Sequence, residues 1–459
     1  MKGSITITFL FLSLLFIACK ARQHNSAPVT NIKIITLDPG HFHAALVQKS
    51  MYAHVDPVVH VYAPEGPDLS LHLDRISSYN NRNENPTGWK EEVYTGPDFL
   101  NRMIADKKGN VVVMSGNNRQ KTTYISRAVE AGFNVLADKP MVIDVQSFQV
   151  LKDAFEKAAR NNVLLYDIMT ERYEITTMLQ REFSLLPNVF GELEKGTPDN
   201  PAVTKESVHH FYKYVSGSVL TRPAWFMDVT QQGEGLVDVT THLVDLIQWA
   251  SFPEQIIDYN KDIQITSARR WTTDMTAGQF RAITKLDDFP GYLKKDVVND
   301  SILKVYSNGE INYTLRGVHA KASVIWAYKA PEGTGDTHYS IMRGTRANLV
   351  IRQGAEQNYK PVLYIEPLAT NQGFENTLTE NLKAVQQKYP GVDLRKTGAG
   401  WEVLIPEKYK EGHEAHFARV TEKFLQYLQE GKLPSWEVPN MLAKYYTTTQ
   451  ALEWALKAK

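Results

Sequence analysis

The spacing of apolar positions divides the chain into two parts near residue 187. In residues 31–187, short apolar runs alternate with stretches whose apolar residues recur at helical spacing. Strands and helices that alternate in this way form a doubly wound parallel sheet. The elements predicted here are strands at 32–37, 57–62, 110–115, 134–137 and 162–168, and helices at 98–107, 122–131 and 145–161, with a further helix starting at 44–49. The Asn-rich stretch 74–96 is predicted to be a surface loop.

Residues 188–459 show a different pattern, in which apolar and polar residues alternate one by one. This period predicts antiparallel strands with one buried face. Strands are predicted at 189–193, 207–214, 263–271, 300–306, 310–316, 323–328, 338–342 and 348–352, and helices at 414–430 and 440–457. The predicted fold class is therefore α/β plus α+β, with a Rossmann-like doubly wound sheet at 31–187 followed by a large, open, mostly antiparallel sheet domain at 188–459.

The amino terminus has the pattern of a processing signal. Residues 5–17 are almost wholly apolar but too few to span a bilayer comfortably, and Ala18 precedes Cys19, the single cysteine of the chain. Residues 15–19 resemble a bacterial lipoprotein signal. This implies a signal peptide at 1–18, lipid on Cys19, a tether at 19–30, and an address at the periplasmic face of an outer membrane. An ordinary secretory signal is the alternative.

Composition narrows the class of partner. Lys plus Arg and Asp plus Glu both total 51, so no excess charge favours binding to nucleic acid. A small-molecule partner is expected. The sequence contains neither the Cys/His spacing of a zinc site nor a Ser-His-Asp signature, so neither a metal nor a serine nucleophile is predicted.

The segment 225–249 carries the strongest candidate chemistry. Asp238, His242 and Asp245 follow at i, i+4 and i+7 on a predicted helix, which places them on one face. A carboxylate one turn from an imidazole can orient the ring and raise its basicity. The spacing thus favours general acid/base chemistry, with a solvated helix face as the alternative.

The turn after the first strand, residues 38–43, stands where a dinucleotide-binding fold has G-x-G-x-x-G. Only the middle glycine, Gly40, is kept. Asp38 would tend to repel phosphate, and His43 is bulky where the third glycine belongs. The residues predicted to bind a cofactor lie in this turn and at later strand ends: Asp38, Gly40, His41, Phe42, His43, Gly116, Asn117, Asn118, Asp138, Lys139 and Pro140.

Two motifs resemble the Gfo/Idh/MocA family, the relatives of glucose-fructose oxidoreductase and inositol dehydrogenase. Residues 131–140, AGFNVLADKP, resemble that family's A-G-K-H-V-x-x-E-K-P, with Asp138 in place of Glu. Residues 233–245 are similar to its G-G-G-x-x-x-D-x-x-x-H-x-x-D. The resemblance implies an NAD(P)-dependent oxidoreductase in which His242 is the acid/base, Lys139 polarises the reacting hydroxyl or relays its proton, and Asp238 positions the substrate or Lys139. Residues 366–407 have no recognised equivalent, which suggests an enlarged C-terminal domain.

Three functions follow from this resemblance. The first is oxidation of a sugar or glycoside hydroxyl with tightly held NAD or NADP, since a periplasmic protein has no known free nicotinamide pool. The second is NAD-dependent glycoside cleavage through transient oxidation at C3. The third is a non-catalytic glycan-binding lipoprotein. Candidates for lining the substrate cleft are Arg172, Tyr212, Lys213, Arg222 and Asp245. The open face of the sheet could also pair with a second copy.

Overall fold

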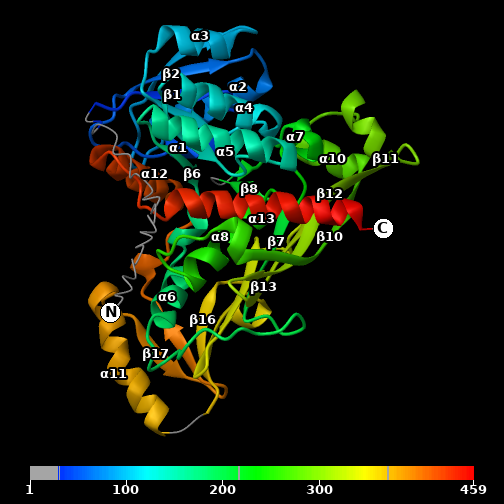
Figure 1. Cartoon of the computed structure of the whole chain (residues 1–459). Helices are drawn as coiled ribbons and strands as arrows, with labels where there is room; N and C mark the ends of the chain where they lie inside the picture. The colour runs from blue at the N-terminus through cyan, green and yellow to red at the C-terminus, as the bar shows by residue number, and fades with distance from the viewer. Residues whose placement is uncertain (1–28, 30, 216–217, 370–371, 459) are drawn as a thin grey trace, which may run out of the picture.

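The computed structural model describes residues 29, 31–215, 218–369 and 372–458. Two sheets dominate it, one above the other in Figure 1, with helix α13 (Glu437–Lys457) running between them. The predicted signal peptide and Cys19 lie outside the described residues, as does all of the tether except residue 29. None of the helices in the described ranges is long and apolar enough to cross a membrane.

The first domain is the predicted doubly wound sheet. Its six strands run parallel in the order β3-β2-β1-β4-β5-β6, so the strand order reverses between β1 and β4. Strands β1, β4, β5 and β6 are buried throughout, as expected for strands covered on both faces. The strands are β1 Ile34–Leu37, β2 Val58–Ala63, β3 Lys90–Thr95, β4 Val111–Met114, β5 Asn134–Asp138 and β6 Leu165–Ile168, and the helices are α1 His43–Val47, α2 Pro67–Asn81, α3 Phe99–Asp106, α4 Asn118–Glu130, α5 Val145–Arg160 and α6 Ile175–Ser184.

The predicted surface loop at 74–96 is confirmed only for residues 82–89, which form neither helix nor strand, and is wrong for the rest. The end of α2 and the whole of β3 occupy this stretch. Strand β3 pairs only with β2, so it is the edge of the sheet, where a charged sequence such as KEEVYT is tolerated. The asparagines that suggested a loop lie at the end of α2 and in residues 82–89, whereas the strand itself is marked by charged residues.

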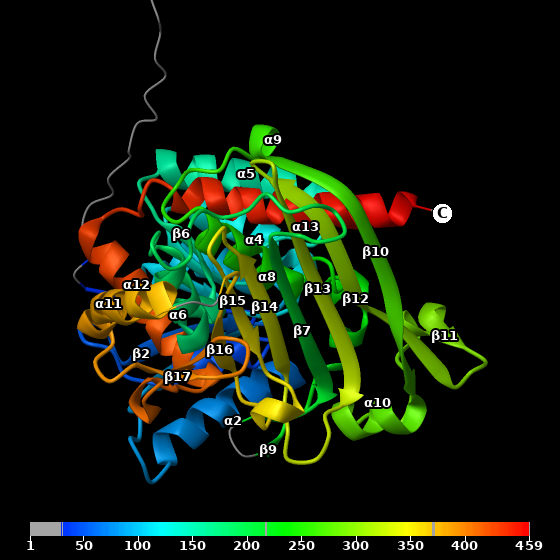
Figure 2. The ribbon, with the colours of Figure 1, turned by 90° about the horizontal axis from the view of Figure 1, so that it is seen from below.

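The second domain contains a ten-stranded mixed sheet. Its order is β10-β12-β13-β7-β14-β15-β16-β18-β17, with β11 paired to β12, and all its pairs are antiparallel except β13 with β7. Figure 2 shows these strands side by side, with α8 (Thr240–Ser251) and α13 beyond them toward the first domain. The strands are β7 Val203–Tyr212, β10 Ile263–Thr276, β11 Val297–Val298, β12 Ile302–Leu315, β13 Val318–Lys329, β14 Thr337–Arg343, β15 Ala347–Arg352, β16 Val362–Pro367, β17 Asp393–Lys396 and β18 Trp401–Leu404.

Two predictions for this sheet need correction. Residues 189–193 form no strand, and only an isolated bridge joins Leu193 to Gly344. The predicted strands 300–306 and 310–316 are one continuous strand, β12, because its Asn308 and Gly309 pair with β10 rather than forming a turn. Helix α11 (Gln372–Lys388), together with β17 and β18, accounts for much of the segment without a recognised family equivalent.

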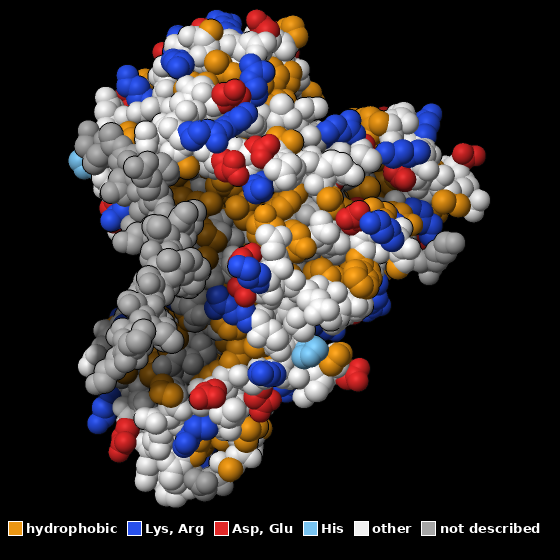
Figure 3. All heavy atoms as spheres, viewed as in Figure 1, with side chains coloured by type: hydrophobic (Ala, Val, Ile, Leu, Met, Phe, Trp, Pro, Cys, Tyr) orange, Lys and Arg blue, Asp and Glu red, His pale blue; other side chains and the backbone are white. Residues whose placement is uncertain are grey.

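The C-terminal helices join the two domains into one body. Helix α12 (His413–Glu430) packs on α1, and Phe417 lies 4.6 Å, centroid to centroid, from the His43 ring. Helix α13 packs on α5, α8 and β10. The main apolar core of the first domain therefore includes Phe424, Met441 and Tyr445 from these helices. Basic and acidic side chains are interspersed over the face seen in Figure 3, in keeping with the balanced net charge.

Candidate active site

The boundary between the domains brings Lys139 and Asp238 together. Lys139 follows β5, and Asp238 lies just before α8, so the pair joins the two domains. The Lys139 Nζ donates to Asp238 Oδ1 at 2.7 Å, and the two side chains are only 9% and 7% exposed. Burial raises the pKa of Asp238, but the Lys139 ammonium outweighs this effect and lowers it below its ordinary value. Two motifs that are 99 residues apart thus share one site.

His242 lies in the first turn of α8, beside this ion pair. Its side chain is buried, and its Nδ1 has no hydrogen-bond partner among the described residues. Burial lowers the pKa of His242 to about 3, and the Lys139 ammonium adds to this effect. The expected pairing in which Asp238 raises the basicity of this ring is therefore not formed, because Asp238 binds Lys139. The imidazole is neutral near pH 7.

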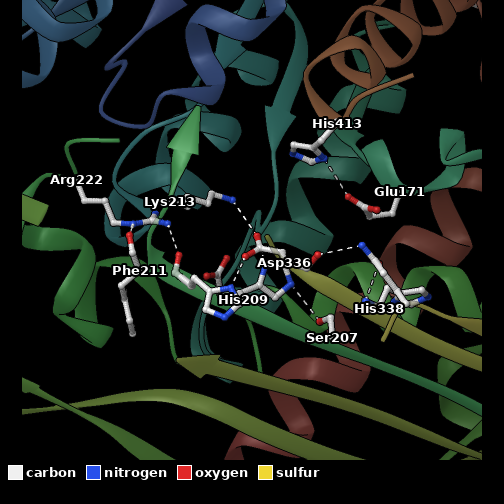
Figure 4. A network of polar contacts seen from close by, with 12 residues as sticks. Glu171, Ser207, His209, Phe211, Lys213, Arg222, Asp336, His338 and His413 are labelled. Atoms are coloured by element: carbon white, nitrogen blue, oxygen red, sulfur yellow. Dashed lines mark hydrogen bonds and ion pairs between the residues drawn. The ribbon is translucent and has the colours of Figure 1, made fainter. Parts of the chain in front are cut away.

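A second pair of ionisable groups, Glu171 and His413, lies near His242. Glu171, in the short helix Thr170–Tyr173, is 3.1 Å from His413 Nδ1 at the start of α12 (Figure 4). Burial raises the pKa of Glu171, but the His413 hydrogen bond and the nearby His242 hold it well below its ordinary value. The sequence analysis did not identify this pair, since no local motif links residues 171 and 413.

Asp336 is another group that the sequence analysis missed. Its carboxylate is contacted by Lys213 Nζ at 3.0 Å and His209 Nδ1 at 3.2 Å (Figure 4), and also by His210 Nδ1 at 3.0 Å. Lys213, a predicted substrate residue, is therefore paired within the protein. Tyr212, another, packs against Tyr328 with ring centroids 6.0 Å apart.

Arg172 and Asp245 occupy a different environment from the one expected for substrate binding. The Arg172 guanidinium donates to both Asp245 oxygens, at 2.6 and 2.7 Å, and to Glu437 at 3.0 Å. Lys444 Nζ lies 2.8 Å from Asp245 and 2.8 Å from Asp167. All five side chains are buried, so these charges bind one another in the interior.

The two departures from the family motifs contact each other. His43, at the position of the third glycine, lies with its Nδ1 2.9 Å from Asp138 Oδ2, the residue that replaces Glu. Ser115 Oγ donates to the same oxygen at 2.8 Å. Burial lowers the pKa of His43 and the Asp138 contact raises it. Burial is the larger effect, so the pKa falls to about 4. His43 and Asp138 thus link α1 to the ends of β4 and β5.

The turn at residues 38–43 lies directly against the end of β4. The His41 amide donates to Ser115 O at 3.1 Å, and a Cβ on Gly116 would lie 2.1 Å from Asp38 O, so only glycine fits there. Asp38 itself has a left-handed φ of 48°, and burial, reinforced by Asp68, raises its pKa to about 6. The Gly40 amide donates to Asp38 O at 2.9 Å.

Asn117 and Asn118 tie the end of β4 to the second domain. Asn117 Nδ2 donates to Gln231 Oε1 and Asn118 Nδ2 to Gln232 O, both at 2.6 Å, on helix α7 (Val229–Gln232). Both amides, predicted to bind a cofactor, therefore fix the domain boundary.

His41, His43 and Asp138 form a candidate metal-binding group, with ligand atoms within 4.8 Å of one another. However, Asp138 Oδ2 already contacts His43 and Ser115, and the Lys139 charge lies close enough to lower the pKa of both histidines. A divalent cation at this place would face that positive charge.

Comparisons with known proteins agree with this architecture. Residues 40–166 match the family model described as "Oxidoreductase family, NAD-binding Rossmann fold", and residues 179–456 match "Putative oxidoreductase C terminal domain". Comparison with the curated proteins gives no match.

Solved structures include a similar chain, described as a "putative oxidoreductase from Parabacteroides merdae ATCC 43184". It is 58% identical, with a TM-score of 0.91, and the alignment covers 95% of this chain and all of the other. Levoglucosan dehydrogenase in complex with NADH and levoglucosan shares the fold at 12% identity, with a TM-score of 0.60 and coverage of 93% and 98%. GenD2 from gentamicin A biosynthesis, in complex with NAD, does so at 15% identity, with a TM-score of 0.54 and coverage of 95% and 97%.

The family models match both domains in order, and the motifs of the two domains meet at their boundary. The chain therefore belongs to the Gfo/Idh/MocA family of oxidoreductases, with an NAD-binding Rossmann domain.

Proposed function

We propose that this oxidoreductase removes hydrogen from a hydroxyl-bearing carbon of a sugar or glycoside. The observation that carries the proposal is the buried Lys139–Asp238 ion pair at the domain boundary, with neutral His242 beside it. The sugar class is supported by the family motifs and by levoglucosan dehydrogenase, whose fold is similar and which was solved with levoglucosan and with L-sorbose.

The three residues have complementary roles in this reaction. Oxidation of an alcohol requires a group that accepts the hydroxyl proton and a positive charge beside the oxygen. Neutral His242 is in the state that accepts a proton, and the Lys139 ammonium is placed to stabilise the negative charge that develops on the oxygen. The 2.7 Å contact with Asp238 holds the Lys139 ammonium in the site and keeps it from extending into solvent.

The turn at residues 40–42 follows β1, beside the point where the strand order reverses, which is where a doubly wound fold holds a dinucleotide. A Cβ on Gly40 would lie 3.0 Å from Trp225 Cζ2 and 3.0 Å from Asp68 Oδ2, so glycine lets these two side chains pack closely on the turn. Three residues are proposed to contact the dinucleotide: His41 and Phe42 in the turn, and Lys139 directly after β5. NAD or NADP, when bound, supplies the acceptor for hydride from the substrate carbon.

The lipoprotein signal around Cys19 supports a place in the cell envelope. No free nicotinamide pool is known there, so a cofactor that stays bound through the catalytic cycle is part of this proposal.

The Glu171–His413 pair favours a second candidate, redox-neutral glycoside cleavage. Transient oxidation at C3 makes the proton at C2 more acidic, and elimination of the aglycone then needs another proton-transfer group. Glu171 and His413 lie close enough to His242 for their charges to act on its pKa, and His242 in turn acts on the pKa of Glu171. Release of aglycone without net reduction of cofactor would identify this reaction.

The test is to mix the purified protein with NAD or NADP and a panel of sugars and aryl glycosides. The proposal predicts growth of the reduced-nicotinamide absorbance band and a keto-sugar product. Absence of cofactor from the denatured protein, together with no thermal shift from NAD or NADP, would instead favour a non-catalytic glycan-binding protein.

A further inference from the structure

Two arginines of the protein lie beside the turn at residues 40–42 without a carboxylate partner. Arg75 is on α2, and Arg222 is in the segment before the short helix Ala224–Met227. Among the described residues, no carboxylate oxygen lies within 4.0 Å of either guanidinium, although most other arginines of the chain are so paired. Both line one narrow hollow with Gly40, His41, Phe42 and Phe226.

Arg222 is held rigidly in this place. Its Nε donates to Phe211 O at 2.8 Å, as Figure 4 shows, and its Nη2 donates to His210 O at 3.1 Å. Its guanidinium lies 4.4 Å from the Phe226 ring centroid. The side chain is only 3% exposed. Neutral carbonyls and rings orient the group, and the carboxylates of Asp336 and Asp238 act on its charge only from beyond 4.0 Å. A buried charge without a contacting counterion is unfavourable.

Arg75 provides a second, more accessible charge. It is half-buried, and its Nη1 makes one long contact of 3.2 Å to Leu71 O. The hollow that it shares with Arg222 is narrow and opens to solvent.

The turn itself lacks the usual means of binding phosphate. Two of the three expected glycines are replaced, and the amides of Gly40 and His41 already donate to Asp38 O and Ser115 O. Asp68 lies nearby, but its Oδ2 accepts the Trp225 indole N–H at 2.7 Å. Positive charge for an anion at this turn must therefore come from side chains.

We infer that Arg75 and Arg222 form an anion site for a phosphate-class group, the diphosphate of a dinucleotide or a phosphate carried by the substrate. Guanidinium groups present paired N–H donors that match phosphate oxygens. The position at the β1 turn, beside the point where strand order reverses, is where doubly wound folds bind dinucleotides, so the diphosphate is the favoured source. Only this choice of source rests on the proposed function.

The experiment is calorimetric titration of the whole protein with inorganic pyrophosphate at constant ionic strength. Wild type is expected to bind one equivalent. Arg75→Gln and Arg222→Lys should each weaken binding by roughly tenfold, the effect of losing one charge-assisted hydrogen-bond pair, and Arg75→Gln should leave the melting temperature unchanged. Arg127→Gln, an exposed arginine on α4, is the matched control and should bind as wild type does.

Separate titrations with NAD and with glucose 6-phosphate distinguish the sources. A parallel loss of NAD affinity in both variants assigns the site to the cofactor, and a loss for glucose 6-phosphate alone assigns it to the substrate. If Arg222→Lys fails to fold, Arg75→Gln decides alone. No pyrophosphate binding by wild type, or equal binding by Arg75→Gln, would overturn the inference, whereas pyrophosphate binding by a protein that oxidises no sugar would refute only the proposed function.

Discussion

Helix α8 and the residues just before it carry two acidic groups, Asp245 and Asp238, which look alike in sequence but have different surroundings in the structure. Asp245 lies in an interior network with Arg172, Glu437 and Lys444, all buried and mutually paired. Asp238, seven residues earlier, pairs with Lys139 at the domain boundary, and the neighbouring His242 Nδ1 has no partner among the residues described. A network whose members are all paired serves stability, whereas an unpaired buried nitrogen beside an ion pair is available for chemistry.

The largest effect is expected from His242→Ala. Loss of a general acid/base group lowers turnover by roughly 10²–10⁴-fold. Turnover on the sugar that reduces bound NAD measures this loss, and NAD affinity and melting temperature should stay near those of wild type. His319→Ala, on β13 and outside the site, is the control. Loss of NAD binding together with turnover would instead make His242 a structural residue.

Asp245→Ala should affect stability rather than chemistry. Removing one partner leaves the charges of Arg172 and Lys444 buried, which costs roughly 3–5 kcal/mol of unfolding free energy. Chemical denaturation measures this change. Arg395→Ala, which removes an exposed pair with Glu402, should cost about 0–1 kcal/mol. A loss as small as the control's for Asp245→Ala would contradict the assignment of the network to stability.

The buried histidines, His242 among them, and Asp245 should also differ in how their contributions to folding stability depend on pH. Burial depresses the folded-state pKa of several histidines, among them His43, His72, His242 and His338, which then bind protons only when unfolded as pH falls below about 6.5. Each subtracts up to about 1.4 kcal/mol per pH unit between 6.5 and its folded pKa. Folded values are about 4 for His43 and about 3 for His72, His242 and His338.

Asp245 behaves differently, because its pKa is lowered in the folded state. Burial alone would raise it, but Arg172 and Lys444 outweigh burial, so its contribution is lost only as pH falls below its ordinary value of 3.8. Denaturation at pH 7 and pH 5 should therefore show a large loss of stability that Asp245→Asn does not remove. Equal stability at both pH values would show that the histidines are not protected from protonation.

The smallest predicted effect concerns Asp38. Its carboxylate lies at the turn proposed to bind phosphate, and Asn tolerates its left-handed φ of 48°. Asp38→Asn should strengthen NAD binding at pH 7 roughly fivefold, about 1 kcal/mol of removed repulsion. The gain should shrink at pH 5, because burial raises the pKa of Asp38 to about 6 and the wild-type group is then protonated. An unchanged affinity at pH 7 would place the phosphate away from this turn.

The fold was predictable where the hydrophobic period was strong. The buried strands of the first domain and both C-terminal helices were expected, and the structure confirms them. Edge strand β3 was missed because its charged sequence has no buried face to mark it. Strand β12 was divided in the prediction because Asn308 and Gly309 resemble a turn in isolation, and tertiary pairing with β10 overrides that preference.

The site was predictable where motifs are local. The spacing of residues 233–245 and the Asp138-Lys139-Pro140 tripeptide identified the residues that meet at the boundary. Spacing alone could not separate the role of Asp245 from that of Asp238, because Lys444, which contacts Asp245, and Glu437, which contacts Arg172, come from the end of the chain. Glu171 with His413 and the cluster around Asp336 were missed for the same reason, since only the fold brings those residues together.

The most direct test of the account is the NMR titration of the His242 imidazole in wild type and in Lys139→Met. Resonance assignment comes from the spectrum of His242→Gln. The account predicts that wild-type His242 stays neutral down to pH 5, with a pKa of about 3, and that loss of the Lys139 ammonium raises this pKa. A wild-type pKa near 6.5, or one that Lys139→Met leaves unchanged, would contradict a shared site for the two groups.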